Sequence, residues 1–221
     1  DYAVTGVQTC ALPIWVDELH DYVYFSSNKD DVHDSQLYRL SLGDKSVARI
    51  TSESGTHSVT IAPDSSAFVD EYSDSKTPPR QVLDRMDGSR VAAIDENHVP
   101  ELAAYHLSPV EFFNVSAEDG TKLCAMMIKP PDFDPAKKYP VLISVYGGPR
   151  AHEVINRWGG FEFLWHEMMA EKGYIIFQVD NRGSYERGHA FETPIYHHFG
   201  KVELAEDRKS TRLNSSHGII W

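Results

Sequence analysis

Two short apolar runs, separated by one amphipathic segment, constrain the fold of this chain more than any other feature. The runs are Val141–Val145 and Tyr174–Val179, and the spacer Phe161–Lys172 carries its apolar residues at helical spacing. Gly173 follows the spacer, as is usual where a helix ends. Runs that are apolar on both faces and joined by a helix are typical of parallel strands in an α/β domain. The sequence therefore predicts a strand, a helix and a parallel strand in that order.

Both apolar runs end in loops rich in glycine and polar residues. Tyr146, Gly147, Gly148 and Pro149 follow the first run, and residues 180–184, Asp-Asn-Arg-Gly-Ser, follow the second. In open parallel sheets, ligand sites form outside the carboxyl ends of the strands. We therefore expect a site at these two loops, although a simple turn explains the glycines equally well.

The first half of the chain shows short strands separated by turns. The turn pairs Gly43-Asp44 and Asp87-Gly88 each stand between two strand candidates, and residues 36–51 resemble residues 81–95. Gly43 and Gly88 are 45 residues apart. A four-stranded unit that recurs at about 40–50 residues is typical of a β-propeller blade. With one repeat visible, a β-sandwich stays open as the alternative.

These patterns predict a domain order, with all-β structure first and α/β structure after it. We expect propeller blades over residues 15–95, a linker over 96–110 and an α/β domain over 111–206. Residues 4–14 and 207–217 can be encoded by complementary DNA strands, residue for residue, and both resemble translated sequencing adapters. We therefore expect residues 1–14 and 207–221 to be artefactual tails that take no part in the fold.

Composition excludes several classes of function. A net charge of −12 disfavours nucleic acid and anionic membranes as partners, and no apolar run reaches the ~20 residues of a membrane span. The histidines at 189, 197 and 198 lack the spacing of a zinc site, and no phosphate-binding loop is present, so we expect no metal and no cofactor. Of the two cysteines, Cys10 falls in an expected tail. Cysteine usage therefore indicates no compartment.

Four motifs occur in order along the α/β part. They are Tyr-Pro-Val-Leu-Ile-Ser-Val-Tyr-Gly-Gly-Pro at 139–149, Asp-Asn-Arg-Gly-Ser at 180–184, Arg-Gly-x-x-Phe-Glu at 187–192, and Gly-x-Val-Glu-x-x-Glu-Asp at 200–207. In this combination the chain resembles the dipeptidyl-peptidase IV branch of the prolyl oligopeptidase family of serine peptidases. The resemblance implies the C-terminal portion of a β-propeller followed by the N-terminal half of an α/β-hydrolase domain.

The resemblance also implies a function and a site. Family members release N-terminal dipeptides, typically after proline or alanine, through a Ser-Asp-His triad that forms an acyl-enzyme. Tyr146 matches the tyrosine whose phenol donates to the oxyanion. Without the motif, a tyrosine at a strand end would be read as a packing residue. Gly147, Gly148, Pro149, Asp180 and Arg182 are candidates for the loops around the substrate.

The chain departs from the family at the nucleophile. It contains no Gly-x-Ser-x-Gly motif, and Ser184 lacks that frame. We therefore expect the chain as given to be inactive. For the parent enzyme, the resemblance implies a peptide substrate and a homodimer. A non-catalytic β-propeller binding module with a vestigial hydrolase domain is an alternative, as is a relative of acylaminoacyl peptidase. Periplasmic and cytoplasmic locations both remain open.

Overall fold

A computed structural model describes residues 11–208, except for the side chains of residues 11–13, 160 and 161. Most of the two expected tails therefore lies outside the described residues. Residues 11–14 are described, and they form the start of a strand that pairs with residues 25–27, contrary to the expectation that they take no part in the fold. The chain forms two compact units. Unit 1 runs to Pro100 and also includes Ile155–Trp158, whereas unit 2 comprises Glu101–Val154 and the chain from Gly159 onward. Each unit is described by itself.

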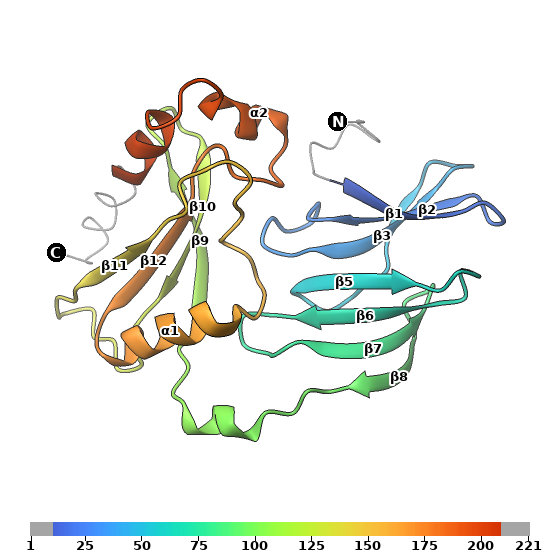
Figure 1. Ribbon diagram of the computed structural model, residues 1–221, viewed down its shortest axis with the longest axis horizontal. Coiled ribbons are helices and arrows are strands. Elements are labelled where there is room, and N and C mark those ends of the chain that lie inside the picture. The colour runs from blue at the N-terminus through green and yellow to red at the C-terminus, as the bar shows by residue number, and fades with distance from the viewer. Residues whose placement is uncertain (1–10, 209–221) are drawn as a thin grey trace. The chain divides into compact units, whose positions relative to one another are not determined.

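Unit 1 consists of two four-stranded antiparallel sheets, each formed by consecutive strands (Figure 1). The strands of the first sheet are β1 (Ala11–Asp17), β2 (Tyr22–Ser27), β3 (Gln36–Ser41) and β4 (Val47–Arg49). Those of the second are β5 (Thr56–Ile61), β6 (Ala67–Ser73), β7 (Arg80–Arg85) and β8 (Arg90–Asp95).

The two sheets repeat at the spacing that the sequence predicts. β1 begins at Ala11 and β5 at Thr56, while β2 begins at Tyr22 and β6 at Ala67, which is 45 residues in both cases. The apolar side chains between the sheets form one cluster of buried residues, namely Tyr24, Leu37, Ile50, Phe68 and Met86. Successive four-stranded meanders with a shared apolar layer are propeller blades, so the propeller prediction is confirmed.

Unit 2 contains a mixed sheet in the order β11-β12-β10-β9. Its strands are β9 (Val110–Ser116), β10 (Lys122–Ile128), β11 (Val141–Ser144) and β12 (Ile175–Asp180). β11 and β12 are parallel, and helix α1 (Gly160–Glu171) connects them, as the apolar runs predict. β10 pairs antiparallel with both β12 and β9. A short 3₁₀ helix, η1 (Pro100–Ala104), precedes the sheet.

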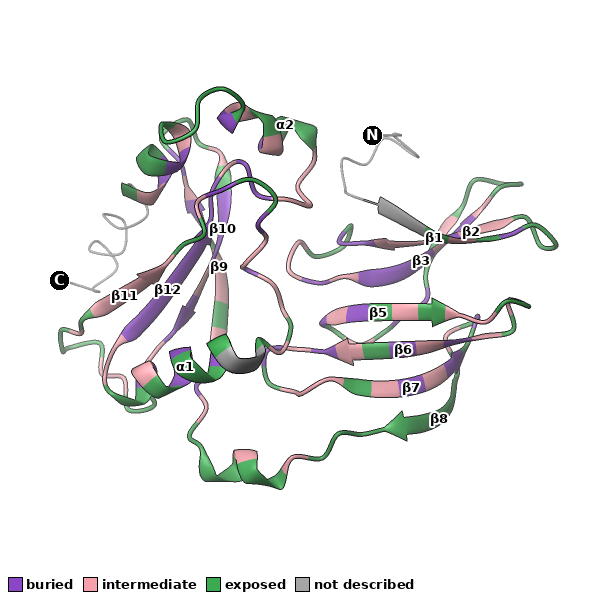
Figure 2. Cartoon of the chain, in the orientation of Figure 1, coloured by how far each residue is buried: buried purple, intermediate pink, exposed green. Residues whose placement is uncertain are grey.

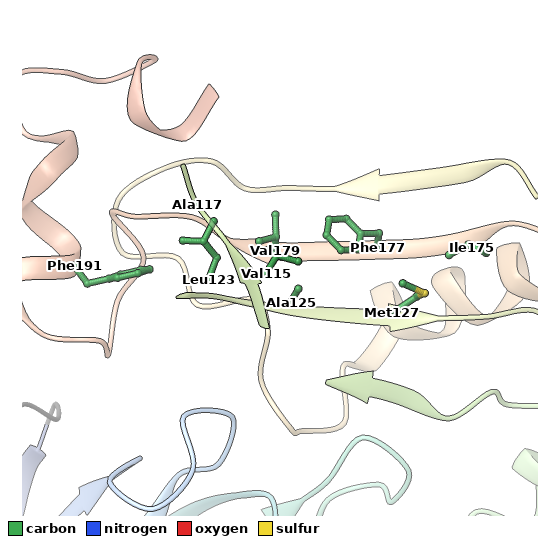
Figure 3. Close-up of a cluster of buried hydrophobic side chains, with 9 residues drawn as sticks. All are labelled: Val115, Ala117, Leu123, Ala125, Met127, Ile175, Phe177, Val179 and Phe191. Atoms are coloured by element: carbon green, nitrogen blue, oxygen red, sulfur yellow. The ribbon is translucent and has the colours of Figure 1, made fainter. Parts of the chain in front are cut away.

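The core of unit 2 lies on the sheet (Figures 2 and 3). All six residues of β12 are buried, and Phe177 packs among side chains from β9 and β10. β11, in contrast, is only half-buried along its length, and Val145 is exposed. The expectation of burial on both faces is wrong for β11, which is the edge strand of this sheet among the described residues.

The apolar residues of α1 are more exposed than their spacing predicts. Leu164, Trp165 and Met168 are exposed, whereas the side chains that face inward are Phe163, His166, Glu167 and Ala170. Glu167 turns inward because its Oε2 accepts the N–H of Ser108 at 2.7 Å. Among the described helices, none is both long and apolar enough to cross a bilayer.

The segment after the Asp180 motif contains a short helix. It consists of α2 (His189–Glu192) and the 3₁₀ turn η2 (Thr193–Ile195). Pro194 has no N–H with which to continue an α-helix, and the Thr193 hydroxyl donates to the His189 carbonyl at 2.8 Å instead. Residues 202–208 are again helical.

Burial of Glu167 predicts that stability depends on pH. Its side chain is 3 % exposed, and burial raises its pKa from 4.5 to about 7. Because the folded state then binds this proton more tightly than the unfolded state, stability falls as pH rises from about 4.5 to about 7. The loss amounts to at most about 3 kcal/mol.

The isosteric substitution Glu167→Gln keeps an oxygen for the Ser108 N–H and removes the titration. We expect the variant to match the parent chain at pH 4.5 and to be more stable at pH 8, as measured by urea denaturation. Equal pH dependence of the two proteins would contradict the assignment. Glu162→Gln is the control, because Glu162 is an exposed carboxylate on the same helix and should leave the pH dependence unchanged.

Candidate active site

The loops that follow β11 and β12 lie at the same edge of the sheet. The strands are parallel and in register from Val141 opposite Ile175 to Ser144 opposite Gln178, so their carboxyl ends coincide. We call residues 145–154 the Tyr146 loop and residues 180–188 the Asp180 loop. The sequence predicts the site at these two loops, and several hydrogen bonds join them.

Tyr146 is followed directly by a turn that contains Gly147 and Gly148. Its side chain is 64 % exposed, so the phenol is accessible to a molecule outside the chain. Gly147 has a φ of +65°, which favours glycine. A Cβ at Gly148 would lie 2.8 Å from Cε1 of Tyr146, so the aromatic ring rests against the backbone of this residue. The ring therefore lies against the turn, and a side chain at 148 would displace it.

Asp180 fixes the far end of the Tyr146 loop. Its Oδ1 accepts the N–H of Glu153 at 3.0 Å, and its Oδ2 accepts the N–H of Val154 at 3.1 Å. The carboxylate is 2 % exposed, and burial raises its pKa despite these two hydrogen bonds. Asp180 thus accepts hydrogen bonds from two backbone N–H groups, which agrees with a role in shaping the loop.

Two backbone hydrogen bonds join the loops further. The N–H of Arg150 donates to the Gly183 carbonyl at 3.3 Å, and the N–H of Tyr185 donates to the Ala151 carbonyl at 2.8 Å. Gly183 has a φ of +101°, and a Cβ there would lie 2.3 Å from Cδ1 of Ile195. The Asp-Asn-Arg-Gly-Ser motif therefore needs its glycine for both backbone conformation and space.

A histidine beside Asp180 is buried, although its position in a polar loop predicts exposure. The pair His152 and Glu153 reads as an exposed loop, but the His152 side chain is only 6 % exposed. Its Nδ1 lies 3.1 Å from Oε2 of Glu186, and its Nε2 lies 3.8 Å from Oδ2 of Asp180. Nearby in sequence, the Arg187 guanidinium stacks over the Phe191 ring at 4.0 Å. No local pattern marks His152 as buried, because its partners come from another loop.

Arg182 is engaged in an ion-pair network. Its Nε donates to Glu206, its Nη1 donates to Asp119 Oδ2 at 2.7 Å, and its backbone N–H donates to Glu206 Oε2 at 2.8 Å. The Glu206 side chain is 3 % exposed, so the guanidinium compensates a buried charge. The N–H of Thr121 and the guanidinium together hold the pKa of Asp119 at about 2. The described contacts of Arg182 thus join three segments of unit 2.

A cavity of about 360 Å³ adjoins both loops. Pro149 and Gly183 contribute to its wall, together with Ile195, Tyr196 and Phe199 from the segment after α2. Tyr196 and Phe199 are exposed, and the sequence analysis did not single them out. Ser184 is 2 % exposed and not accessible as a nucleophile. Among residues 11–208, no group of three or more histidine, cysteine, aspartate or glutamate side chains has the arrangement of a metal site.

Comparison with family models gives two matches. Residues 5–79 match the dipeptidyl peptidase IV N-terminal region, and residues 161–219 match the prolyl oligopeptidase family. The curated relatives include dipeptidyl peptidase 8 of Mus musculus, which is 31 % identical over 201 residues, and a probable dipeptidyl peptidase 4 of Emericella nidulans, 31 % identical over 228 residues. These alignments cover 86 % and 93 % of this chain but 22 % and 28 % of the relatives. The chain thus spans about a quarter of their length.

Solved structures give the same fold. The crystal structure of Porphyromonas gingivalis dipeptidyl peptidase 4 matches with a TM-score of 0.87 at 23 % identity, covering 98 % of this chain and 31 % of that one. A putative dipeptidyl aminopeptidase IV of Bacteroides ovatus matches with a TM-score of 0.84 at 28 % identity, covering 97 % of this chain and 31 % of that one. The similarity therefore extends across both units of the chain.

Proposed function

This chain belongs to the dipeptidyl-peptidase IV branch of the prolyl oligopeptidase family, and from that premise we propose that it is part of a serine exopeptidase that releases N-terminal dipeptides. In this proposal residues 15–95 are propeller blades, 96–110 the linker and 111–206 the first part of the hydrolase domain. The substrate is a peptide, and the whole enzyme is a homodimer.

The observation that supports the proposal most is the way in which the Tyr146 loop is held. Tyr146 is exposed at the carboxyl end of β11, and the loop behind it is fixed by Asp180. When a serine oxygen attacks a scissile carbonyl, the carbonyl oxygen becomes negatively charged. A phenol on a loop whose backbone is hydrogen-bonded to Asp180 can donate to that oxyanion, and such a donor stabilises the transition state.

The nucleophile of the proposed enzyme comes from outside this sequence. The 221 residues contain no Gly-x-Ser-x-Gly motif, and Ser184 is buried. We therefore propose that the chain by itself does not hydrolyse peptides, and that Tyr146 acts on an acyl transfer whose serine, aspartate and histidine are supplied by the rest of the protein. Gly147, Gly148 and Pro149 line the approach to the scissile bond, while Asp180 and Arg182 keep the loops in shape.

Two preparations test the proposed function. We expect the full-length protein encoded by the parent gene to cleave Gly-Pro p-nitroanilide and to be inhibited by a phosphonate that reacts with serine. The 221-residue chain should show neither cleavage nor phosphonate labelling. Labelling of the isolated chain would refute its proposed inactivity. A full-length protein that binds peptides without cleaving them would instead favour the non-catalytic binding module.

A further inference from the structure

The buried side chain of His152 joins the two loops of the candidate active site, both of which belong to unit 2. Only 6 % of this side chain is exposed, and its Nδ1 lies 3.1 Å from Oε2 of Glu186. Because an ionised carboxylate can only accept a hydrogen bond, Nδ1 carries the hydrogen and donates it. A side chain of the Tyr146 loop is therefore bonded to the second half of the Asp180 loop.

The other ring nitrogen of His152 faces the first residue of the Asp180 loop. Nε2 lies 3.8 Å from Oδ2 of Asp180, which is too long for a hydrogen bond but within the range of an ion pair. Within the described part of the chain, Nε2 has no hydrogen-bond partner. Asp180 and Glu186 are six residues apart, so one imidazole spans most of this loop. Its removal would take away a contact with each of the two carboxylates.

His152 lies in the middle of the part of the Tyr146 loop that is hydrogen-bonded to the Asp180 loop. Before it, the backbone of residues 150–151 is bonded to the backbone of residues 183–185. After it, the N–H groups of residues 153–154 donate to the carboxylate of Asp180. The four backbone groups and the imidazole thus act on five consecutive residues. The second half of the Tyr146 loop is therefore joined to the Asp180 loop at every residue.

The charges around Asp180 connect His152 to the backbone bonds. Burial raises the pKa of Asp180, and its two N–H donors, His152 and Arg187 oppose that rise. The Arg187 guanidinium is itself held over the Phe191 ring at 4.0 Å. An ionised carboxylate accepts a backbone N–H more strongly than a neutral one does. In its protonated form, His152 therefore supports the state of Asp180 that holds the Tyr146 loop.

We propose that His152 is a positioning residue for Tyr146, an inference that rests on the proposed function. Through Glu186 and Asp180, the imidazole holds the second half of the Tyr146 loop against the Asp180 loop, and the first half carries the phenol. Because the imidazole is buried, it acts through the loop and does not touch the substrate. Without it, the exposed Tyr146 ring would depart from the position in which it meets the oxyanion.

The test uses His152→Ala in the full-length protein. We expect kcat for Gly-Pro p-nitroanilide to fall by about 10- to 100-fold, since small displacements of catalytic groups have effects of this size. KM should change less than about threefold, because the phenol acts on the transition state. His198→Ala is the matched control, because His198 is an exposed histidine of the same unit and lies outside both loops. It should leave kcat and KM unchanged.

Two further substitutions at position 152 separate hydrogen bonding from the filling of space. The amide nitrogen of asparagine can take the place of Nδ1 and donate to Glu186, so His152→Asn should recover most of the kcat that His152→Ala loses. Leucine fills the space without a donor, so His152→Leu should be about as slow as His152→Ala. Equal kcat values for the asparagine and leucine variants would overturn the inference.

A double variant tests whether His152 acts through the phenol. If it does, His152→Ala should reduce kcat much less in a Tyr146→Phe background than in the parent protein. Equal losses in both backgrounds, or full activity of the single variant, would contradict the positioning role. Glu186→Ala removes the acceptor and keeps the buried ring, so it serves where His152→Ala does not fold. We expect it to lower kcat by a smaller factor, and an unchanged kcat would again count against the inference.

Amide hydrogen exchange in the full-length protein provides an arm that does not need activity. We expect His152→Ala to accelerate exchange of the amides of residues 150–154, and His198→Ala to leave it unchanged. The amides of β12 should exchange at the parent rate in both variants, and their acceleration would indicate general destabilisation in place of positioning. Unchanged exchange in the loop would overturn the anchor itself. If the full-length parent protein shows no peptidase activity, the proposed function fails, whereas exchange accelerated only in the loop would still support His152 as its anchor.

Discussion

Replacing Tyr146 with phenylalanine should lower kcat of the full-length protein by about 10²–10³-fold, because removing one oxyanion donor typically has this effect. The ring would keep its place against the Gly148 backbone, so we expect KM for Gly-Pro p-nitroanilide to change little. The loss should therefore be one of transition-state stabilisation. Steady-state kinetics at fixed pH measure it. A kcat within threefold of that of the parent protein would remove Tyr146 from the proposed mechanism.

Three further variants test whether the effect depends on the position of the Tyr146 ring. Tyr196→Phe is the matched control, since Tyr196 is another exposed tyrosine and lines the neighbouring cavity, and it should leave kcat unchanged. Gly148→Ala should reduce kcat by displacing the Tyr146 ring, because the new Cβ would lie 2.8 Å from Cε1. Gly147→Ala adds a Cβ with nothing within 4 Å, so it reports only the cost of its backbone conformation.

Replacing Gly183 with alanine should destabilise unit 2 by about 2–5 kcal/mol. One part of the cost, about 1–2 kcal/mol, is conformational, because Gly183 has a φ of +101°. The other part is steric and adds about 1–3 kcal/mol, since the new Cβ would lie 2.3 Å from Cδ1 of the buried Ile195. Urea denaturation of the parent and variant chains gives the difference in unfolding free energy.

Gly173→Ala separates the two contributions. Gly173 has a similar φ of +89°, but no atom lies within 4 Å of a Cβ built there, so this variant should show the conformational cost alone. Adding Ile195→Val to Gly183→Ala removes the clashing Cδ1 and should recover part of the steric cost. If the two alanine variants were equally destabilised, the contact between Gly183 and Ile195 would not contribute.

Much of the architecture follows from local patterns. The turn pairs Gly43-Asp44 and Asp87-Gly88, with the 45-residue spacing between them, predict the repeated four-stranded sheets that the structure contains. The two apolar runs and their helical spacer predict the parallel pairing of β11 and β12. Hydrophobic periodicity and turn chemistry depend on residues close together in the chain, which is why these elements can be read without coordinates.

The face of α1 and the limits of the C-terminal helix were less predictable. The apolar positions of α1 indicate one buried face, but Glu167 turns inward to bind a backbone N–H from residue 108, which is 59 residues away. The spacing of apolar residues carries no information about such a partner. Pro194, in contrast, is a local signal that does account for the early end of α2.

The sequence by itself determined the order of elements, the family resemblance and the position of Tyr146 at the end of a strand. Only the tertiary structure decided which polar groups are held, and by what. His152 is buried beside Asp180, Arg182 compensates the charge of Glu206, and Oδ1 of Asn156 accepts the N–H of Ser75, which is 81 residues away. The reason is physical: a polar side chain is stabilised in the interior only by partners, and these partners come from segments distant in sequence.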